Sequence, residues 1–164
     1  LPFSAERGDA FDLIVMSGER EHVEQDRAAV EAVVKLLKPG GLLVCTGPAH
    51  QWMWSSHDVY NHHFRRYSRS GFARLFDGLP LTRLALSYAN AAMFAPMAAV
   101  RIATRMLNGD RPADSAHGGP EIRPLPALIN RPLTGLFAAE RLLIPHVSLP
   151  VGSSVIAAFR RNAT

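Results

Sequence analysis

The sequence predicts an α/β fold: a partial doubly wound sheet with a helical insertion before the last strand. Two nearly continuous apolar runs, at 11–16 and 42–46, are typical of strands buried on both faces of a parallel sheet. Between them, Val30, Val33, Val34 and Leu37 recur at helical spacing. A strand, a helix and a second strand in this order predict a right-handed βαβ unit.

The remaining elements follow from local signals. Lys38, Pro39 and the two glycines after them end the first helix. Ser68 is placed to cap a short helix that carries Phe72. In chain order, the others are a strand at 81–88, an apolar helix at 90–107 kinked at Pro96, a loop at 108–126, a helix with Pro132 in its first turn, and a last strand at 152–160.

Composition indicates one globular domain with a sizeable core. The chain has 164 residues, of which 48% are hydrophobic and 20% charged, and this excludes a disordered tail or a collagen-like repeat. The single cysteine, Cys45, excludes an internal disulfide framework and lies in an apolar run that predicts burial. We divide the domain into 1–48 (strand, helix, strand), 49–67 (site loop), 68–107 (helix, strand, helix), 108–126 (loop) and 127–164 (helix, last strand).

Charge is distributed unevenly along the chain. The formal net charge is +4, with the acidic excess in residues 1–50 and the basic excess, nearly all arginine, in residues 51–164. Arginine suits anionic substrates or lipid surfaces, although coding bias explains the same excess. The arginines are scattered without aromatic interleaving, so we expect no nucleic-acid binding.

The densest polar cluster lies in the irregular segment 49–67, directly after the second predicted strand. Ligands bind at the carboxyl ends of strands in open α/β sheets, so this segment is the candidate site. A surface loop with a structural arginine and a packed tyrosine is the simpler alternative. The histidine spacing matches no zinc pattern, so we expect no metal. The candidate catalytic residues are His57, Asp58, His63, Arg66 and Tyr67.

Two neighbouring features each allow two interpretations. Trp52 and Trp54 either wall an apolar substrate pocket or pack into the core. Residues 88–107 are too polar at Arg101 and Arg105 for a confident membrane span. They fit a buried or lid helix, with docking at a membrane surface as the alternative.

The order of motifs resembles the C-terminal half of a class I S-adenosylmethionine-dependent methyltransferase of the type 11/12 kind. The resemblance rests on LPF at 1–3, FDLIV at 11–15, EHV at 21–23 and LLKPGGLLV at 36–44. A narrower subgroup is suggested by QWMWSSHD at 51–58, HFRRY at 63–67 and PVGSS at 150–154. The order of these stretches extends the resemblance over nearly the whole chain.

The resemblance implies a Rossmann-like sheet and methyl transfer from S-adenosylmethionine to a small or lipid-like acceptor. It implies that Ser17, Gly18 and His22 line the methionine side of the cofactor, and that the segment 49–67 orients the acceptor. His57 or His63 would take the acceptor's proton. The implied localisation is cytoplasmic, with possible membrane association.

The chain also departs from the family pattern. The family's glycine-rich cofactor loop and its ribose-binding acidic residue belong before Leu1, and Gly18 stands where the subgroup has Asp. We therefore expect an incomplete cofactor pocket, with an exposed strand edge covered by a homodimer partner or by a missing N-terminal half. The alternative is a non-catalytic methyltransferase-like module that acts through a partner protein or a membrane surface.

Overall fold

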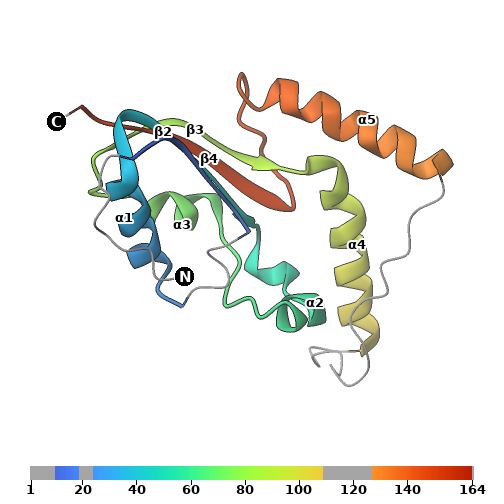
Figure 1. The fold of residues 1–164 in the computed structure, drawn as a ribbon. Helices are drawn as coiled ribbons and strands as arrows, with labels where there is room; N and C mark the ends of the chain where they lie inside the picture. The colour runs from blue at the N-terminus through green and yellow to red at the C-terminus, as the bar shows by residue number, and fades with distance from the viewer. Residues whose placement is uncertain (1–9, 19–23, 109–126, 164) are drawn as a thin grey trace.

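The computed structural model describes residues 10–18, 24–108 and 127–163. This part of the chain contains four strands and five α-helices, with a 3₁₀ turn at Gln51–Met53 (Figure 1). Their bounds are β1 (Phe11–Ser17), α1 (Asp26–Leu36), β2 (Leu37–Pro48), α2 (Ser56–Tyr60), α3 (Arg69–Arg74), β3 (Leu81–Ala89), α4 (Ala91–Asn108), α5 (Ala127–Leu143) and β4 (Ser154–Arg161).

The four strands form one mixed sheet in the order β1-β2-β4-β3. β1 pairs with β2 in parallel, whereas β4 runs antiparallel to both of its neighbours. β1, β2 and β3 therefore point the same way, and their carboxyl ends meet at one edge. The predicted α/β fold is confirmed, including the helical insertion, α5, before the last strand.

The core lies on one face of the sheet, which α1 and α3 cover together (Figure 1). Val30 and Val34 of α1 reach the sheet, and Phe72 and Phe76 of the α3 region pack beside them. Cys45 is buried in this layer, as predicted. Alternate residues of β1 point to the other face, where Phe11, Leu13 and Val15 are exposed.

Two local predictions need correction. Segment 49–67 is not irregular throughout, because it contains the 3₁₀ turn and α2. Pro132 does not lie in a first turn: α5 begins at Ala127, and Pro132 lies inside it. The predicted loop at 108–126 lies outside the described residues except for Asn108, which ends α4.

A glutamate from α5 fixes the start of α4. The Glu140 carboxylate accepts hydrogen bonds from the backbone N–H of Asn90 and of Ala91, the latter at 2.9 Å. These N–H groups are orphan donors at a helix N-terminus, where a carboxylate is also favoured by the helix dipole. Within the described residues, neither α4 nor any other helix combines the length and apolar character that crossing a membrane requires.

Candidate active site

The carboxyl edge of the sheet gathers residues from four strands. Ser17 ends β1, His50 follows β2, and Asn90 follows β3. β4 starts at the same edge, because Ser154 pairs with both Pro48 and Ala89. This edge carries the segment 49–67, so the candidate site lies where parallel strands commonly bind ligands.

Helix α2 is held by a capping box. The Ser55 backbone N–H and its hydroxyl both donate to Asp58 Oδ2, at 2.9 and 3.0 Å, and Asp58 is the third residue of the helix. This reciprocal arrangement satisfies donors that a short helix would otherwise leave open. The pattern Ser-x-x-Asp is visible in the sequence and could have predicted α2.

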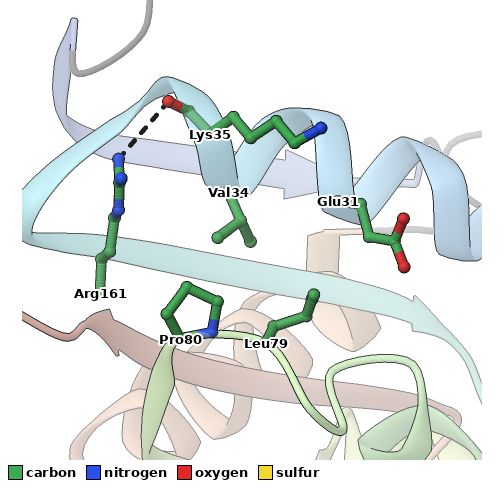
Figure 2. Close-up of a pocket in the computed structure, with 6 residues that line it drawn as sticks. All are labelled: Glu31, Val34, Lys35, Leu79, Pro80 and Arg161. Carbon is green, nitrogen blue, oxygen red and sulfur yellow. Dashed lines mark hydrogen bonds between the residues drawn. The ribbon is translucent and has the colours of Figure 1, made fainter. Parts of the chain in front are cut away.

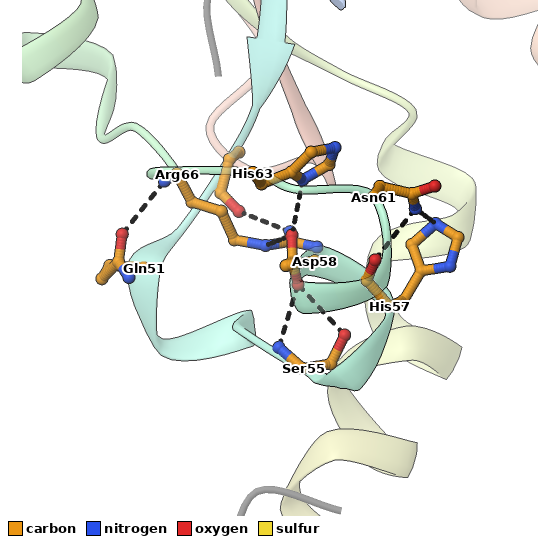
Figure 3. A network of polar contacts seen from close by, with 8 residues as sticks. Gln51, Ser55, His57, Asp58, Asn61, His63 and Arg66 are labelled. Carbon is orange, nitrogen blue, oxygen red and sulfur yellow. Dashed lines mark hydrogen bonds and ion pairs between the residues drawn. The ribbon is translucent and has the colours of Figure 1, made fainter. Parts of the chain in front are cut away.

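Asp58 is the centre of a buried polar network (Figure 3). Its side chain is fully buried, and Oδ1 receives hydrogen bonds from Arg66 Nε at 2.8 Å and His63 Nδ1 at 2.9 Å. Arg66 is also nearly buried and donates to the carbonyl oxygen of Ala49 at 3.1 Å. The structure thus brings together three of the five predicted catalytic residues: Asp58, His63 and Arg66.

The environment of Asp58 keeps its carboxylate ionised. Burial alone raises the pKa of Asp58, because it penalises the charged form. The hydrogen bonds from Arg66, His63 and Ser55 and the positive charge of Arg66 outweigh that effect and hold the pKa below its ordinary value. A carboxylate on Nδ1 of His63 also fixes the ring orientation and, in the neutral ring, leaves Nε2 as the proton acceptor. Figure 3 shows the far side of the ring pointing away from Asp58.

Tyr67 points away from this network. It is buried against Phe72, and its hydroxyl donates to Asp26 Oδ2 at 3.0 Å. Asp26 is buried as well and pairs with Arg65 at 3.1 Å. The contacts of Tyr67 and Arg65 therefore tie the site segment to the start of α1.

We expect Tyr67→Phe to lower the free energy of unfolding by about 1.5–3 kcal/mol, because a buried carboxylate loses one charged hydrogen bond. Urea denaturation measures this loss. Tyr60→Phe is the matched control: Tyr60 is 59% exposed, and its variant should change stability by less than about 0.5 kcal/mol. Equal stability of the two variants would contradict a supporting role for the Tyr67 hydroxyl.

The other predicted site residues lie at different places. His57 is exposed on α2, with Nε2 2.9 Å from Asn61 Nδ2. Ser17 and Gly18 are exposed at the end of β1, where the Ser17 hydroxyl accepts a hydrogen bond from Thr46 at 3.2 Å. His22 lies outside the described residues.

His50 is a site residue that the sequence reasoning missed. Its ring stacks on Tyr88 at a centroid distance of 4.7 Å and lies 5.1 Å from Phe94 and 6.0 Å from Trp52. Within the described part of the chain, its buried Nε2 has no hydrogen-bond partner. Burial lowers the pKa of His50, a hydrogen bond with the Gly152 backbone partly offsets this, and the charge of Arg66 lowers the pKa further. Its position two residues after Pro48, which ends β2, was the available signal.

His50 also has an unusual backbone conformation, with φ at 61°. Positive φ is uncommon outside glycine and costs of order 1–3 kcal/mol, so it is retained only where the surroundings impose it. Trp52 packs edge-on to Phe94 at 6.1 Å, so this tryptophan lies in the aromatic cluster around His50.

Arg101 of α4 is the second residue that was missed. Burial lowers the pKa of Arg101, as do the charges of Arg66 and Arg105, whereas Asp58 raises it. Arg65 and Arg66 are engaged within the protein, but Arg101 makes no ion pair with any described residue. Arg101 is therefore a partly buried guanidinium near the site that no described carboxylate pairs with directly.

Elsewhere, a shallow pocket lies at the opposite edge of the sheet (Figure 2). It is lined by Glu31, Val34, Lys35, Leu79, Pro80 and Arg161. Arg161 pairs with Leu81 at the start of β3, which places this pocket far from the carboxyl edge. No group of three potential metal ligands gathers anywhere in residues 10–18, 24–108 and 127–163.

Comparisons at the sequence level give no match, either to a model of a protein family or to a curated protein. Solved structures do match. The chain is similar to a Haloferax volcanii protein solved in complex with the Trm112 methyltransferase activator (TM-score 0.51, 14% identity, 100% of this chain and 58% of that one). It is also similar to an S-adenosylmethionine-dependent methyltransferase from Mesorhizobium loti (TM-score 0.50, 12% identity, 94% and 63%).

These similarities extend over nearly the whole chain. The chain thus spans 58% and 63% of the lengths of these two structures. At such low identity the likeness concerns the fold, and it agrees with the sheet and its helical insertion. The chain therefore shares part of a Rossmann-like α/β fold with these solved methyltransferase structures.

Proposed function

We propose that the protein takes part in S-adenosylmethionine-dependent methyl transfer to a small or lipid-like acceptor. The observation that carries the proposal is the buried Asp58–His63–Arg66 network at the carboxyl edge of a methyltransferase-like sheet. A pure scaffold has no need for an oriented histidine at that edge. The site's position and its chemistry therefore support the same function.

The end of β1 fits one side of the cofactor. Gly18 is exposed and has φ at 67°, so its backbone can approach a ligand without a Cβ in the way. Ser17 adds a hydroxyl at the same place, and His22 remains a proposed neighbour. When bound, S-adenosylmethionine supplies an electrophilic methyl group.

The chain's own residues would orient the acceptor and accept its proton. Asp58 holds His63 by Nδ1, so that Nε2 is placed to take the proton from an acceptor hydroxyl or amine. Arg66 and Tyr67 act as positioning residues, because their polar groups are engaged inside the protein. His57 at the surface is the alternative proton acceptor.

The first experiment is calorimetric titration of the protein with S-adenosylmethionine, with its mass in solution recorded alongside. Binding at micromolar strength supports a complete pocket for S-adenosylmethionine. Absence of binding by the folded protein would contradict the proposed enzymatic function.

The exposed side chains of β1 need a partner surface. We propose that a second copy or a preceding half domain covers them.

We expect His63→Ala to reduce turnover by about 10²–10⁴-fold while leaving the dissociation constant of S-adenosylmethionine unchanged. The measurement is S-adenosylhomocysteine release with an acceptor found by screening. His146→Ala, which removes an exposed histidine elsewhere, is the matched control. Unchanged turnover in His63→Ala would reject His63 as the base.

A non-catalytic module is the second candidate. The observation that favours it is the number of large apolar side chains exposed on α4 and α5, such as Met106 and Leu142. One structural neighbour was solved with an activator protein, which supports a partner-dependent role of this kind. Failure to bind S-adenosylmethionine together with stable partner binding would favour this candidate.

A further inference from the structure

An apolar surface lies next to the candidate site, on two elements that are far apart in the sequence. The α2 segment exposes Val59, Tyr60 and Phe64, and the end of α4 exposes Ile102, Met106 and Leu107. We call these six residues the apolar tip. Met106 and Leu107 are 82% and 84% exposed, which is unusual for large apolar side chains without a partner.

The two helices that carry the apolar tip, α2 and α4, lie near each other. Figures 1 and 3 both show α2 beside α4, and Arg101 of α4 lies near enough to Asp58 of α2 for their charges to interact. Along α4, the residues of intermediate exposure around Phe94 and Arg101 belong to the side that meets the site. Met106 and Leu107 extend beyond it, so the tip borders the site.

Among the residues that the structure describes, the two segments that carry the apolar tip have exposed charges of one sign. Segment 49–67 contains a single acidic residue, Asp58, which is buried and paired, and α4 contains none. The basic side chains at the same place are Arg101 and Arg105 on α4. In these two described segments, apolar side chains and arginines occur without exposed carboxylates, which is a pattern of helices that bind anionic lipid surfaces.

A second copy of the chain fits this surface less well. A symmetric dimer through the apolar tip would place arginines of one copy near those of the other, and like charges oppose such an interface. We therefore propose that the apolar tip docks the protein onto an anionic lipid surface. Docking brings the site network to that surface, so an acceptor within the lipid layer could reach it. This last consequence rests on the proposed methyl transfer, whereas docking does not.

Flotation with vesicles tests the docking. The protein should float with vesicles of phosphatidylcholine mixed with phosphatidylglycerol, remain unbound with phosphatidylcholine alone, and dissociate as salt is raised. The double variant Met106→Glu/Leu107→Glu should bind the mixed vesicles at least about tenfold more weakly, because binding scales with buried apolar area. Val147→Glu places a negative charge at an exposed apolar residue outside the tip, and this control should float as the unchanged protein does.

The other outcomes each overturn the proposal. Equal flotation of the double variant would place the lipid contact elsewhere, and equal binding to both vesicle types would remove the anionic preference. No flotation, together with a dimer that the double variant dissociates, would identify the tip as an interface between copies. The unfolding midpoint of each variant is measured as a control and should equal that of the unchanged protein. Calorimetry with S-adenosylmethionine on the same samples separates a failure of docking from a failure of the proposed function.

Discussion

Asp58→Ala is expected to lower the free energy of unfolding by about 3–5 kcal/mol, since it leaves a buried guanidinium without its counter-charge. The Arg66 side chain is only 6% exposed, and its guanidinium would keep the hydrogen bond to the carbonyl oxygen of Ala49. The same change removes the hydrogen bond to His63 Nδ1 and the capping box of α2. Urea denaturation measures the loss.

Asp12→Ala provides the matched control, because Asp12 forms an exposed pair with Lys38 and is itself 83% exposed. Surface pairs of this kind contribute about 0–1 kcal/mol. If Asp58→Ala were as mild as this control, the buried network would not stabilise the site segment.

The effect of Asp58 should also depend on pH. The pKa of Asp58 is lower in the folded protein than its ordinary value, so the stabilisation is complete above the unfolded pKa. It is lost as the pH falls through the folded pKa. The stability difference between the unchanged protein and Asp58→Ala should therefore shrink only in acid, below about pH 4. A difference that shrinks at neutral pH would point to another group.

Gly152→Ala is expected to destabilise the protein by about 3 kcal/mol or more, because the new Cβ would lie 2.2 Å from the Ala89 carbonyl oxygen. The obstacle is backbone at the end of β3, so it cannot yield as a flexible side chain does. The segment before β4 would have to move, and with it the backbone that hydrogen-bonds to His50. Thermal or urea unfolding detects the change.

Gly135→Ala is the control for this substitution. A Cβ at Gly135, inside α5, meets nothing within 4 Å, so alanine there should stabilise the protein by about 0.5–1 kcal/mol. The two substitutions should therefore change the free energy of unfolding in opposite directions. A neutral Gly152→Ala would show that this segment is loose enough to absorb a methyl group.

The sequence predicted those features that local patterns encode. Apolar runs marked β1 and β2, helical spacing marked α1, and Ser68 marked the start of α3, where its hydroxyl accepts a hydrogen bond from the Gly71 N–H at 3.0 Å. The polar cluster after β2 predicted Asp58 and His63 as site residues, although it did not predict the hydrogen bond between them. Each of these signals lies within a few residues of the feature that it predicts.

The missed features depend on contacts between distant residues. Glu140 caps α4 across 50 residues, and nothing around it in the sequence distinguishes it from a surface glutamate. The stacking of His50 on Tyr88 and its tilted contact with Phe94 need β3 and α4 to be in place. Pro132 suggested a helix start because proline favours the first turn, yet the structure has it inside α5. Such contacts form only when the whole fold is in place, so local sequence patterns do not predict them.

The place of β4 in the sheet has a consequence for synthesis on the ribosome. β4 comes after all the other strands in the chain but lies between β2 and β3, where Phe159 pairs with both Leu43 and Arg83. Because chains fold from the N-terminus as they emerge, the edges of β2 and β3 that bind β4 stay unpaired until β4 has been synthesised. Closure of this sheet is therefore a late event, and the nascent chain depends on protection from aggregation until then.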